Sequence, residues 1–199
     1  MSNESVGKRE DLIPALATER MVLRPLEAGD HVQVQRLFPQ WEVVKYLNDR
    51  VPWPFPEDGV MEYQRDFALP AMERGEEWHW TLRLLERPGE IIGAIGLFAN
   101  AGNNRGFWLA PEWHGRGLMT EAVFAVNDYW FDALGFAVLR APKAAAKVGS
   151  RRISEKTGMR MVETGEANYV CGKLPSETWK ITREEWRAWR GSHLPGTDT

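Results

Sequence analysis

The sequence predicts an α+β fold, in which a mixed, mostly antiparallel central sheet is flanked by helices. Residues 105–134 read as a strand, a sharp glycine-containing turn and a long helix. Two apolar segments, 78–85 and 91–98, are joined by Glu86-Arg87-Pro88-Gly89, a sequence typical of a hairpin turn.

A single domain is expected. The composition, 43% hydrophobic and 27% charged, is that of an ordinary globular protein, and 199 residues can form one well-filled core. Because no repeat or linker divides the chain, we place one domain at residues 18–190. A flexible tail is expected at 1–17 and a polar tail at 191–199.

The first half of the chain is predicted to contain a strand and three helices. The strand covers 20–26, and the helices cover 30–38 (with Asp30 as a possible cap), 42–47 and 58–74. In Val51–Gly59 three prolines alternate with aromatic residues, which excludes a helix or a central strand. This segment is either a stiff connector whose aromatics enter the core or a rigid wall of a substrate site.

The second half follows from the same rules. After the hairpin at 78–98, Pro111 ends the strand that begins at Arg105, and apolar residues at helical spacing predict a helix over 118–134. The remaining expected elements are a strand at 137–142, a short helix at 147–157, strands at 160–163, 167–173 and 178–181, and a terminal helix at 183–190.

The turn before the long helix has the properties of an anion site. Gly115 and Gly117 can adopt backbone conformations closed to other residues, and the helix start offers unpaired N–H groups at the positive end of its dipole. The dinucleotide fingerprint is excluded because Thr120 stands where it requires glycine. A Walker loop is excluded because Leu118-Met119 follow Gly117.

The bulk composition excludes several other classes. A net charge of −3 argues against a nucleic-acid-binding protein, and the single cysteine, Cys171, excludes an internal disulfide and fits a reducing compartment. No apolar run approaches the roughly 20 residues of a membrane span, and no signal peptide is recognisable. The four histidines lack metal-site spacing. We therefore expect a cytoplasmic protein without a metal.

The motifs resemble those of the GNAT acetyltransferases. Glu112-Trp113-His114-Gly115-Arg116-Gly117 is similar to their coenzyme A pyrophosphate loop. The segments Thr18–Leu26, Pro52–Pro56 and Ser150–Met159 resemble the branch of the ribosomal-protein N-terminal acetyltransferases. Glu112 departs from the usual Gln or Arg, and Lys147 stands where the family usually has an asparagine that contacts the pantetheine arm.

This resemblance implies a GNAT-type acyl-CoA N-acyltransferase fold and direct transfer of an acetyl group from acetyl-CoA to a primary amine. The acceptor would be a protein or peptide N-terminus or a small amine. The residues expected to bind the co-substrate are Trp108, Leu109 and Ala110 through the main chain, His114, Gly115, Arg116, Gly117, Leu118 and Met119 through the turn, and Lys147.

The resemblance also places catalytic and acceptor residues. Ser150 lies where some members of the branch protonate the departing thiolate, although a helix-capping serine is an equal alternative. Trp53 and Phe55 would form one wall of the amine site. No general base is assigned. The competing hypothesis is a non-catalytic acyl-CoA-binding sensor or assembly module, and we expect a monomer or a homodimer.

Overall fold

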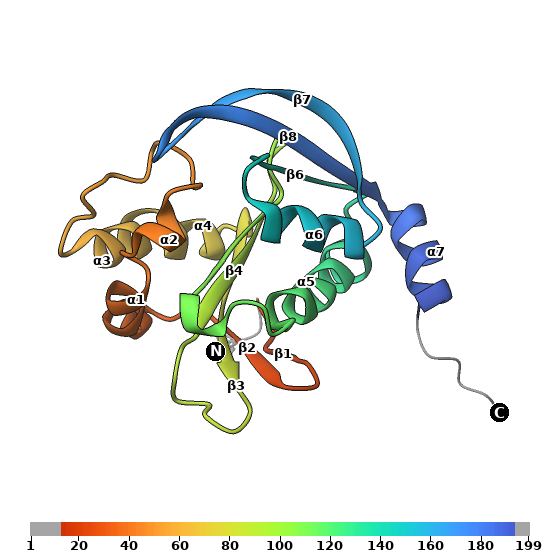
Figure 1. The fold of residues 1–199 in the computed structure, drawn as a ribbon. Coiled ribbons are helices and arrows are strands. Elements are labelled where there is room, and N and C mark those ends of the chain that lie inside the picture. The colour runs from red at the N-terminus through yellow and green to blue at the C-terminus, as the bar shows by residue number, and fades with distance from the viewer. Residues whose placement is uncertain (1–12, 194–199) are drawn as a thin grey trace, which may run out of the picture.

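The computed structural model describes residues 13–193, which form two sheets and seven helices (Figure 1). The first sheet has the strand order β1-β2-β3-β4-β5, and the second has the order β6-β8-β7. Their bounds are β1 Leu16–Ala17, β2 Met21–Pro25, β3 Glu77–Leu84, β4 Gly93–Phe98, β5 Arg105–Leu109, β6 Val138–Ala144, β7 Arg160–Tyr169 and β8 Gly172–Thr182. Every pairing among these strands is antiparallel.

The predicted α+β class is confirmed, with corrections at the edges. The sheet is divided in two rather than being one central sheet. Residues 1–12 and 194–199 of the expected tails lie outside the described residues. Leu16–Ala17, expected in the flexible tail, pair with β2, and Gly191–His193, expected in the polar tail, complete the last helix.

The helices lie close to their predicted positions. Their bounds are α1 His31–Leu37, α2 Trp41–Val44, α3 Gly59–Tyr63, α4 Leu69–Glu73, α5 Leu118–Asp128, α6 Val148–Lys156 and α7 Arg183–His193. A π-helical turn at Gln64–Ala68 joins α3 to α4, so the helix predicted over 58–74 is one rod with a widened middle. A second π-helical turn, Tyr129–Ala133, extends α5 in the same way.

The core lies between α5 and the five-stranded sheet. The buried face of α5, which includes Ala122, Val123 and Val126, belongs to the same cluster as Leu82 and Ile95 of the sheet. The period of these apolar residues is helical, which is why the sequence predicted this helix correctly. The packing fixes the start of α5, and with it the glycine turn, against the sheet.

A long hairpin carries the second sheet across the molecule. β7 and β8 arch over the other elements, drawn in blue in Figure 1, and their turn reaches the segment that follows α2. There the Val170 N–H donates to the Leu47 carbonyl (3.0 Å), and the Cys171 N–H donates to the Lys45 carbonyl (3.1 Å). Three short strands were expected over 160–181, and the structure corrects this to two long ones.

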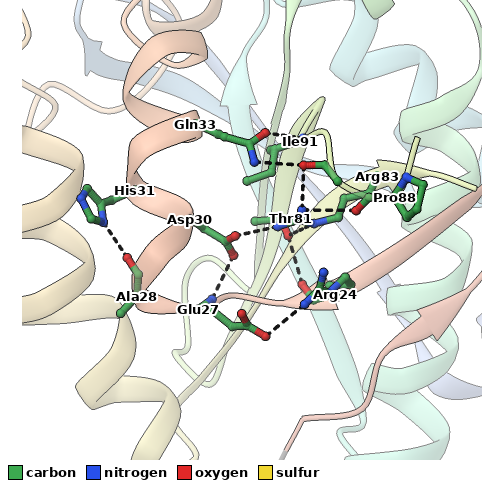
Figure 2. A network of polar contacts seen from close by, with 11 residues as sticks. Arg24, Glu27, Ala28, Asp30, His31, Gln33, Thr81, Arg83, Pro88 and Ile91 are labelled. Carbon is green, nitrogen blue, oxygen red and sulfur yellow. Dashed lines mark hydrogen bonds and ion pairs between the residues drawn. The ribbon is translucent and has the colours of Figure 1, made fainter.

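A buried ion pair ties α1 to β3. The Arg83 guanidinium donates to Asp30 Oδ1 at 2.6 Å, and the two side chains are only 6% and 9% exposed (Figure 2). The other oxygen, Asp30 Oδ2, accepts from the Glu27 N–H at 3.0 Å, so Asp30 does not cap α1 as the sequence suggested. Gln33 adds contacts from α1 to the β3–β4 turn, at the Ile91 N–H and the Gly89 carbonyl.

Removing the Asp30 carboxylate should destabilise the fold strongly. In Asp30→Ala the Arg83 charge would stay buried without its partner, and breaking a buried pair in this way costs about 3–5 kcal/mol. The exposed pair of Asp132 with Arg187 (2.8 Å) supplies the control, because Asp132→Ala should cost less than about 1 kcal/mol. Urea unfolding of both variants measures the difference, and equal costs would contradict a structural role for the Asp30 pair.

Candidate active site

The two sheets separate where β5 meets β6. The Asn104 N–H donates to the Arg140 carbonyl (2.8 Å), and the Arg140 N–H donates to Asn104 Oδ1 (2.7 Å). Beyond this junction β5 pairs with β4 and β6 pairs with β8. Because an antiparallel strand presents its hydrogen-bonding groups alternately to its two sides, the main-chain groups of Phe107 and Leu109 face away from β4. Within residues 13–193 the divergence therefore leaves this edge of β5 without a neighbouring strand, although the Leu109 carbonyl contacts His114 Nε2 at 2.8 Å.

A groove of about 550 Å³ runs along this edge. One side is formed by β5 and the turn that follows it, including Trp108, Leu109 and His114. The opposite side is the start of α6, where Lys147 and Ser150 lie. Glu42, Val43, Lys45 and Tyr46, in α2 and just after it, also line the groove. The groove thus connects the beginning of α5 with the beginning of α6.

The turn at the start of α5 offers a set of unpaired amides. Gly115 and Gly117 have φ of +73° and +79°, the left-handed region that favours glycine. Within residues 13–193, the N–H groups of residues 115–119 have no hydrogen-bond acceptor. Arg20 steadies this turn by donating to the Arg116 carbonyl (3.0 Å) and pairing with Glu121 (2.7 Å). Five amides at a positive helix end fit a pyrophosphate.

The opposite side of the groove is also basic. Arg152 and Lys156 stand four residues apart on α6, so they share one face of the helix, and both line the groove. Both side chains are exposed and can follow an anion into the groove. The anion-binding character predicted for the turn therefore extends across the groove to a helix that the sequence had not assigned to phosphate binding.

Three residues expected to contact the co-substrate are placed differently. The Ala110 N–H donates to Ile92 (2.9 Å) and its carbonyl accepts from Trp113 (2.9 Å), so Ala110 has no free main-chain group and lies outside the groove lining. The His114 N–H is used by Pro111 (3.1 Å), although its ring lines the groove. The Arg116 side chain lies over the Trp113 ring, outside the lining.

The other expected residues come together. Trp108, Leu109, Gly115, Gly117, Leu118, Met119, Lys147 and Ser150 all line the groove. The main-chain groups of Trp108 nevertheless pair with Ala94 of β4, so the main-chain contact expected of this residue is corrected. Ser150 is only 8% exposed, and it is the third residue of α6, with Lys147 at the N-cap position and no side-chain cap hydrogen bond. The capping interpretation of Ser150 is therefore wrong. Its hydroxyl has no hydrogen-bond partner in the described part of the chain and is available to a ligand.

A second cavity of about 280 Å³ adjoins the groove at Lys147 and Ser150, which line both. It lies in the divergence between β5 and β6 and is bounded by the β7–β8 hairpin and the segment after α2. Asn48 and Asn168 are exposed members of its lining, so the cavity opens to solvent beside them. The two cavities thus share four lining residues, Tyr46, Phe107, Lys147 and Ser150.

Three basic residues line the second cavity, and the sequence had not singled out two of them, Arg105 and Lys143. Both are buried, with the Arg105 guanidinium against Asn127 and Lys143 Nζ against Ser154, whereas Lys147 lines the cavity from the start of α6. Burial, followed by the Arg105 charge, lowers the pKa of Lys143 to about 6, and burial lowers the pKa of Lys147 to about 8. The available sequence signal for Lys143 was a charged residue between apolar ones in a strand, but the predicted strand ended at Pro142, one residue before it.

The predicted acceptor wall lies elsewhere. Trp53 is 44% exposed and packs against Trp41, with ring centroids 5.4 Å apart. Phe55 packs against Phe38 (5.3 Å), in a small cluster under α1 and α3. Neither aromatic side chain lines the groove or the second cavity. The connector interpretation of this proline-rich segment describes Phe55 better than the wall interpretation does.

The described residues contain no group of three or more His, Cys, Asp or Glu side chains that could hold a metal ion. None of the helices in this part of the chain combines the length and apolar character needed to cross a bilayer.

The comparisons with known proteins agree with this geometry. Residues 20–160 match the family described as the acetyltransferase (GNAT) domain. The uncharacterized N-acetyltransferase YoaA of Bacillus subtilis (strain 168) is 28% identical over 151 residues, which are 74% of this chain and 83% of that protein.

Two solved structures share the fold. The first is RimL, a ribosomal L7/L12 α-N-protein acetyltransferase in complex with coenzyme A, with a TM-score of 0.72, 11% identity and coverage of 85% and 98% of the two chains. The second is the spermidine N-acetyltransferase SpeG of Vibrio cholerae, with a TM-score of 0.67, 17% identity and coverage of 84% and 96%. Since the family match spans most of the chain, the protein belongs to the GNAT acetyltransferase family, as the resemblance of its motifs predicted.

Proposed function

We propose that the protein binds acetyl-CoA in the groove and transfers the acetyl group directly to a primary amine. The observation that carries this proposal is the row of five unpaired amides, residues 115–119, at the mouth of a groove that leads to Ser150. The amides and the basic side chains of α6 would hold the phosphates. The free edge of β5 would pair with the amide-containing pantetheine arm as an added strand does.

The proposed transfer involves the amine, the thioester, Ser150 and water, and its bonds and protons balance without a metal. The acceptor nitrogen attacks the thioester carbonyl carbon, a nitrogen–carbon bond forms, and the carbon–sulfur bond breaks with its electron pair on sulfur. The nitrogen releases a proton to water, and Ser150 supplies a proton to the sulfur before recovering one from water. What supports Ser150 in this role is its position between the two cavities and its unpartnered hydroxyl.

Two classes of acceptor remain within this proposal, a protein or peptide N-terminus and a small amine. RimL is named for the first class and SpeG for the second, and both share only the fold with this chain. The competing proposal is a non-catalytic acyl-CoA-binding module, which Lys147 and the absence of an assigned base leave open. Release of free thiol from acetyl-CoA in the presence of peptides and small amines distinguishes an enzyme from a sensor.

The glycine turn should be essential for acetyl-CoA binding. Gly117→Val would place a branched side chain in a left-handed conformation and pull the amides away from the pyrophosphate, so affinity should fall tenfold or more. Gly75→Val is a matched control, because Gly75 also has positive φ (+69°) but lies outside both cavity linings. Calorimetry on both folded variants is the measurement, and equal affinities would remove the turn from the site.

Ser150 should affect the rate more than binding. Ser150→Ala should lower turnover by about 10²–10⁴-fold, the usual effect of losing a proton-transfer group, with little change in acetyl-CoA affinity. Ser150→Cys keeps a small side chain with a dissociable proton and should retain more of the rate. Steady-state kinetics decide the point, since an alanine variant with wild-type turnover would exclude Ser150 as the acid.

A further inference from the structure

Four residues line both the groove and the second cavity, and they surround the place where donor and acceptor would meet. They are Tyr46, Phe107, Lys147 and Ser150. Phe107 has no ionisable group, and Tyr46 and Ser150 carry hydroxyl groups. Lys147 carries an amine, which is the strongest proton acceptor among these neutral groups when its lone pair is free. The proposed transfer uses Ser150 but gives Lys147 no chemical step.

The backbone holds Lys147 and Ser150 in one turn at the start of α6. Lys147 is the N-cap residue, and its carbonyl accepts from the Ser150 N–H at 3.0 Å. Its own N–H donates to the carbonyl of Ala144, the last residue of β6, at 2.9 Å. Lys147 is therefore fixed at both main-chain groups, and its side chain leaves a defined turn beside that of Ser150.

The amine of Lys147 has no polar partner within residues 13–193. Its Nζ lies over the ring of Phe107, 5.8 Å from the centroid, and forms no hydrogen bond or ion pair in that range. Lys143 differs, because its Nζ donates to the hydroxyl of Ser154 at 2.6 Å and Ser154 lines neither cavity. Of these two lysines, Lys147 is the one whose amine is available to a substrate.

This setting favours the neutral form of the amine. Burial lowers the pKa of Lys147 to about 8, and a general base works best when its pKa lies near the working pH. Charged and titratable residues surround it from several elements, and none forms an ion pair with Lys147 in the described part of the chain. Those that line the two cavities or adjoin them on α6 and β8 are Glu42, Lys45, Tyr46, Arg105, His114, Lys143, Arg151, Arg152, Lys156, Tyr169 and Glu177.

From this geometry we infer that Lys147 is the general base of the proposed transfer, and that its neutral amine takes a proton from the acceptor where the two cavities join. The inference rests on the proposed acetyl transfer, in which the donor lies in the groove and the acceptor reaches it from the second cavity. It gives the proton a specific acceptor in place of bulk water, and it places the base and the proposed acid three residues apart on one turn.

The proton transfers balance. The acceptor enters as an ammonium ion, and Lys147 takes one proton and becomes an ammonium ion itself, which frees the acceptor's lone pair. The nitrogen attacks the thioester carbonyl carbon, and the carbon–sulfur bond breaks with its electron pair on sulfur. Ser150 protonates the sulfur and recovers, through water, the second proton that the nitrogen releases. Lys147 then returns its proton to water, so the products are an amide, a free thiol and one proton.

The first test separates a base from a positive charge. Lys147→Arg keeps the charge, but a guanidinium does not lose its proton in a protein, so it can hold a phosphate and cannot act as a base. Thiol release with the fastest amine or peptide of the panel should fall about 10²–10⁴-fold in Lys147→Arg and in Lys147→Met alike. The affinity for coenzyme A, measured by calorimetry, should change little in Lys147→Arg. Wild-type turnover in Lys147→Arg would overturn the inference.

The pH dependence gives a readout that a structural role would not change. The ratio of wild-type to Lys147→Arg kcat/KM should rise about tenfold per pH unit up to about pH 8 and then level off, because only the neutral amine accepts a proton. The acceptor's own ionisation cancels in this ratio. Lys173→Arg is the matched control, since Lys173 lies in an exposed pair with Glu166 outside both linings and should show a constant ratio. A ratio that stays level or falls with pH would exclude Lys147 as the base.

A measurement on the wild-type protein decides the point even if the variants fail to fold. Brief labelling with acetic anhydride at a series of pH values, read by mass spectrometry, reports the neutral fraction of each lysine. Labelling of Lys147 should level off above about pH 8 and slow down when coenzyme A is bound, whereas coenzyme A should not protect Lys173. Labelling of Lys147 that still rises beyond about pH 10 would contradict the inference. Wild-type protein that releases no thiol with any amine would overturn the transferase and the base together, whereas turnover that survives in Lys147→Arg would overturn the base alone.

Discussion

The divergence of β5 from β6 is the constraint on which the functional parts of this molecule depend. A strand inside a sheet satisfies its main-chain groups on both sides, but in the described part of the chain the outer edge of β5 has no strand beside it after the Asn104–Arg140 junction. An unpaired edge is usually covered or blunted in a stable protein. Here it lines both the groove and the second cavity, and both openings exist because the second sheet turns away at this point.

Local sequence predicted the elements whose pattern is local. The apolar period of α5, the left-handed glycines before it and the stop at Pro111 are each properties of neighbouring residues, and all three were predicted correctly. The β7–β8 hairpin was misread as three strands because most of β7 is exposed and carries no alternating apolar pattern. Its register comes from pairing with β8 and from the contact of its turn with residues 45–47, which are distant in sequence.

The candidate site likewise has one part that neighbouring residues could predict and another that they could not. The turn proposed to bind the co-substrate is one continuous segment, so the sequence could predict it. The hydrogen bonds of the Ala110 and His114 amides to Ile92 and Pro111 were not predicted, because the motif does not specify this local geometry. The second cavity is assembled from β5, β6, α6 and the hairpin, and no local pattern joins Arg105 to Lys143. Conversely, the proline-rich segment had a conspicuous pattern, but Phe55 packs into a small apolar cluster and Trp53 packs on Trp41, and neither lines a cavity.

The contact between the β7–β8 turn and the segment after α2 lets the second cavity and the amide turn change independently in evolution. The hairpin and residues 46–48 line the second cavity, whereas the amide turn before α5 lies on a different part of the chain. In the proposed function the acceptor meets the acyl donor where the two cavities join, so substitutions or length changes in the hairpin would reshape the acceptor chamber while the amide turn keeps its geometry. A scaffold divided in this way would acquire new acceptors by changes in one hairpin, without losing its acyl donor.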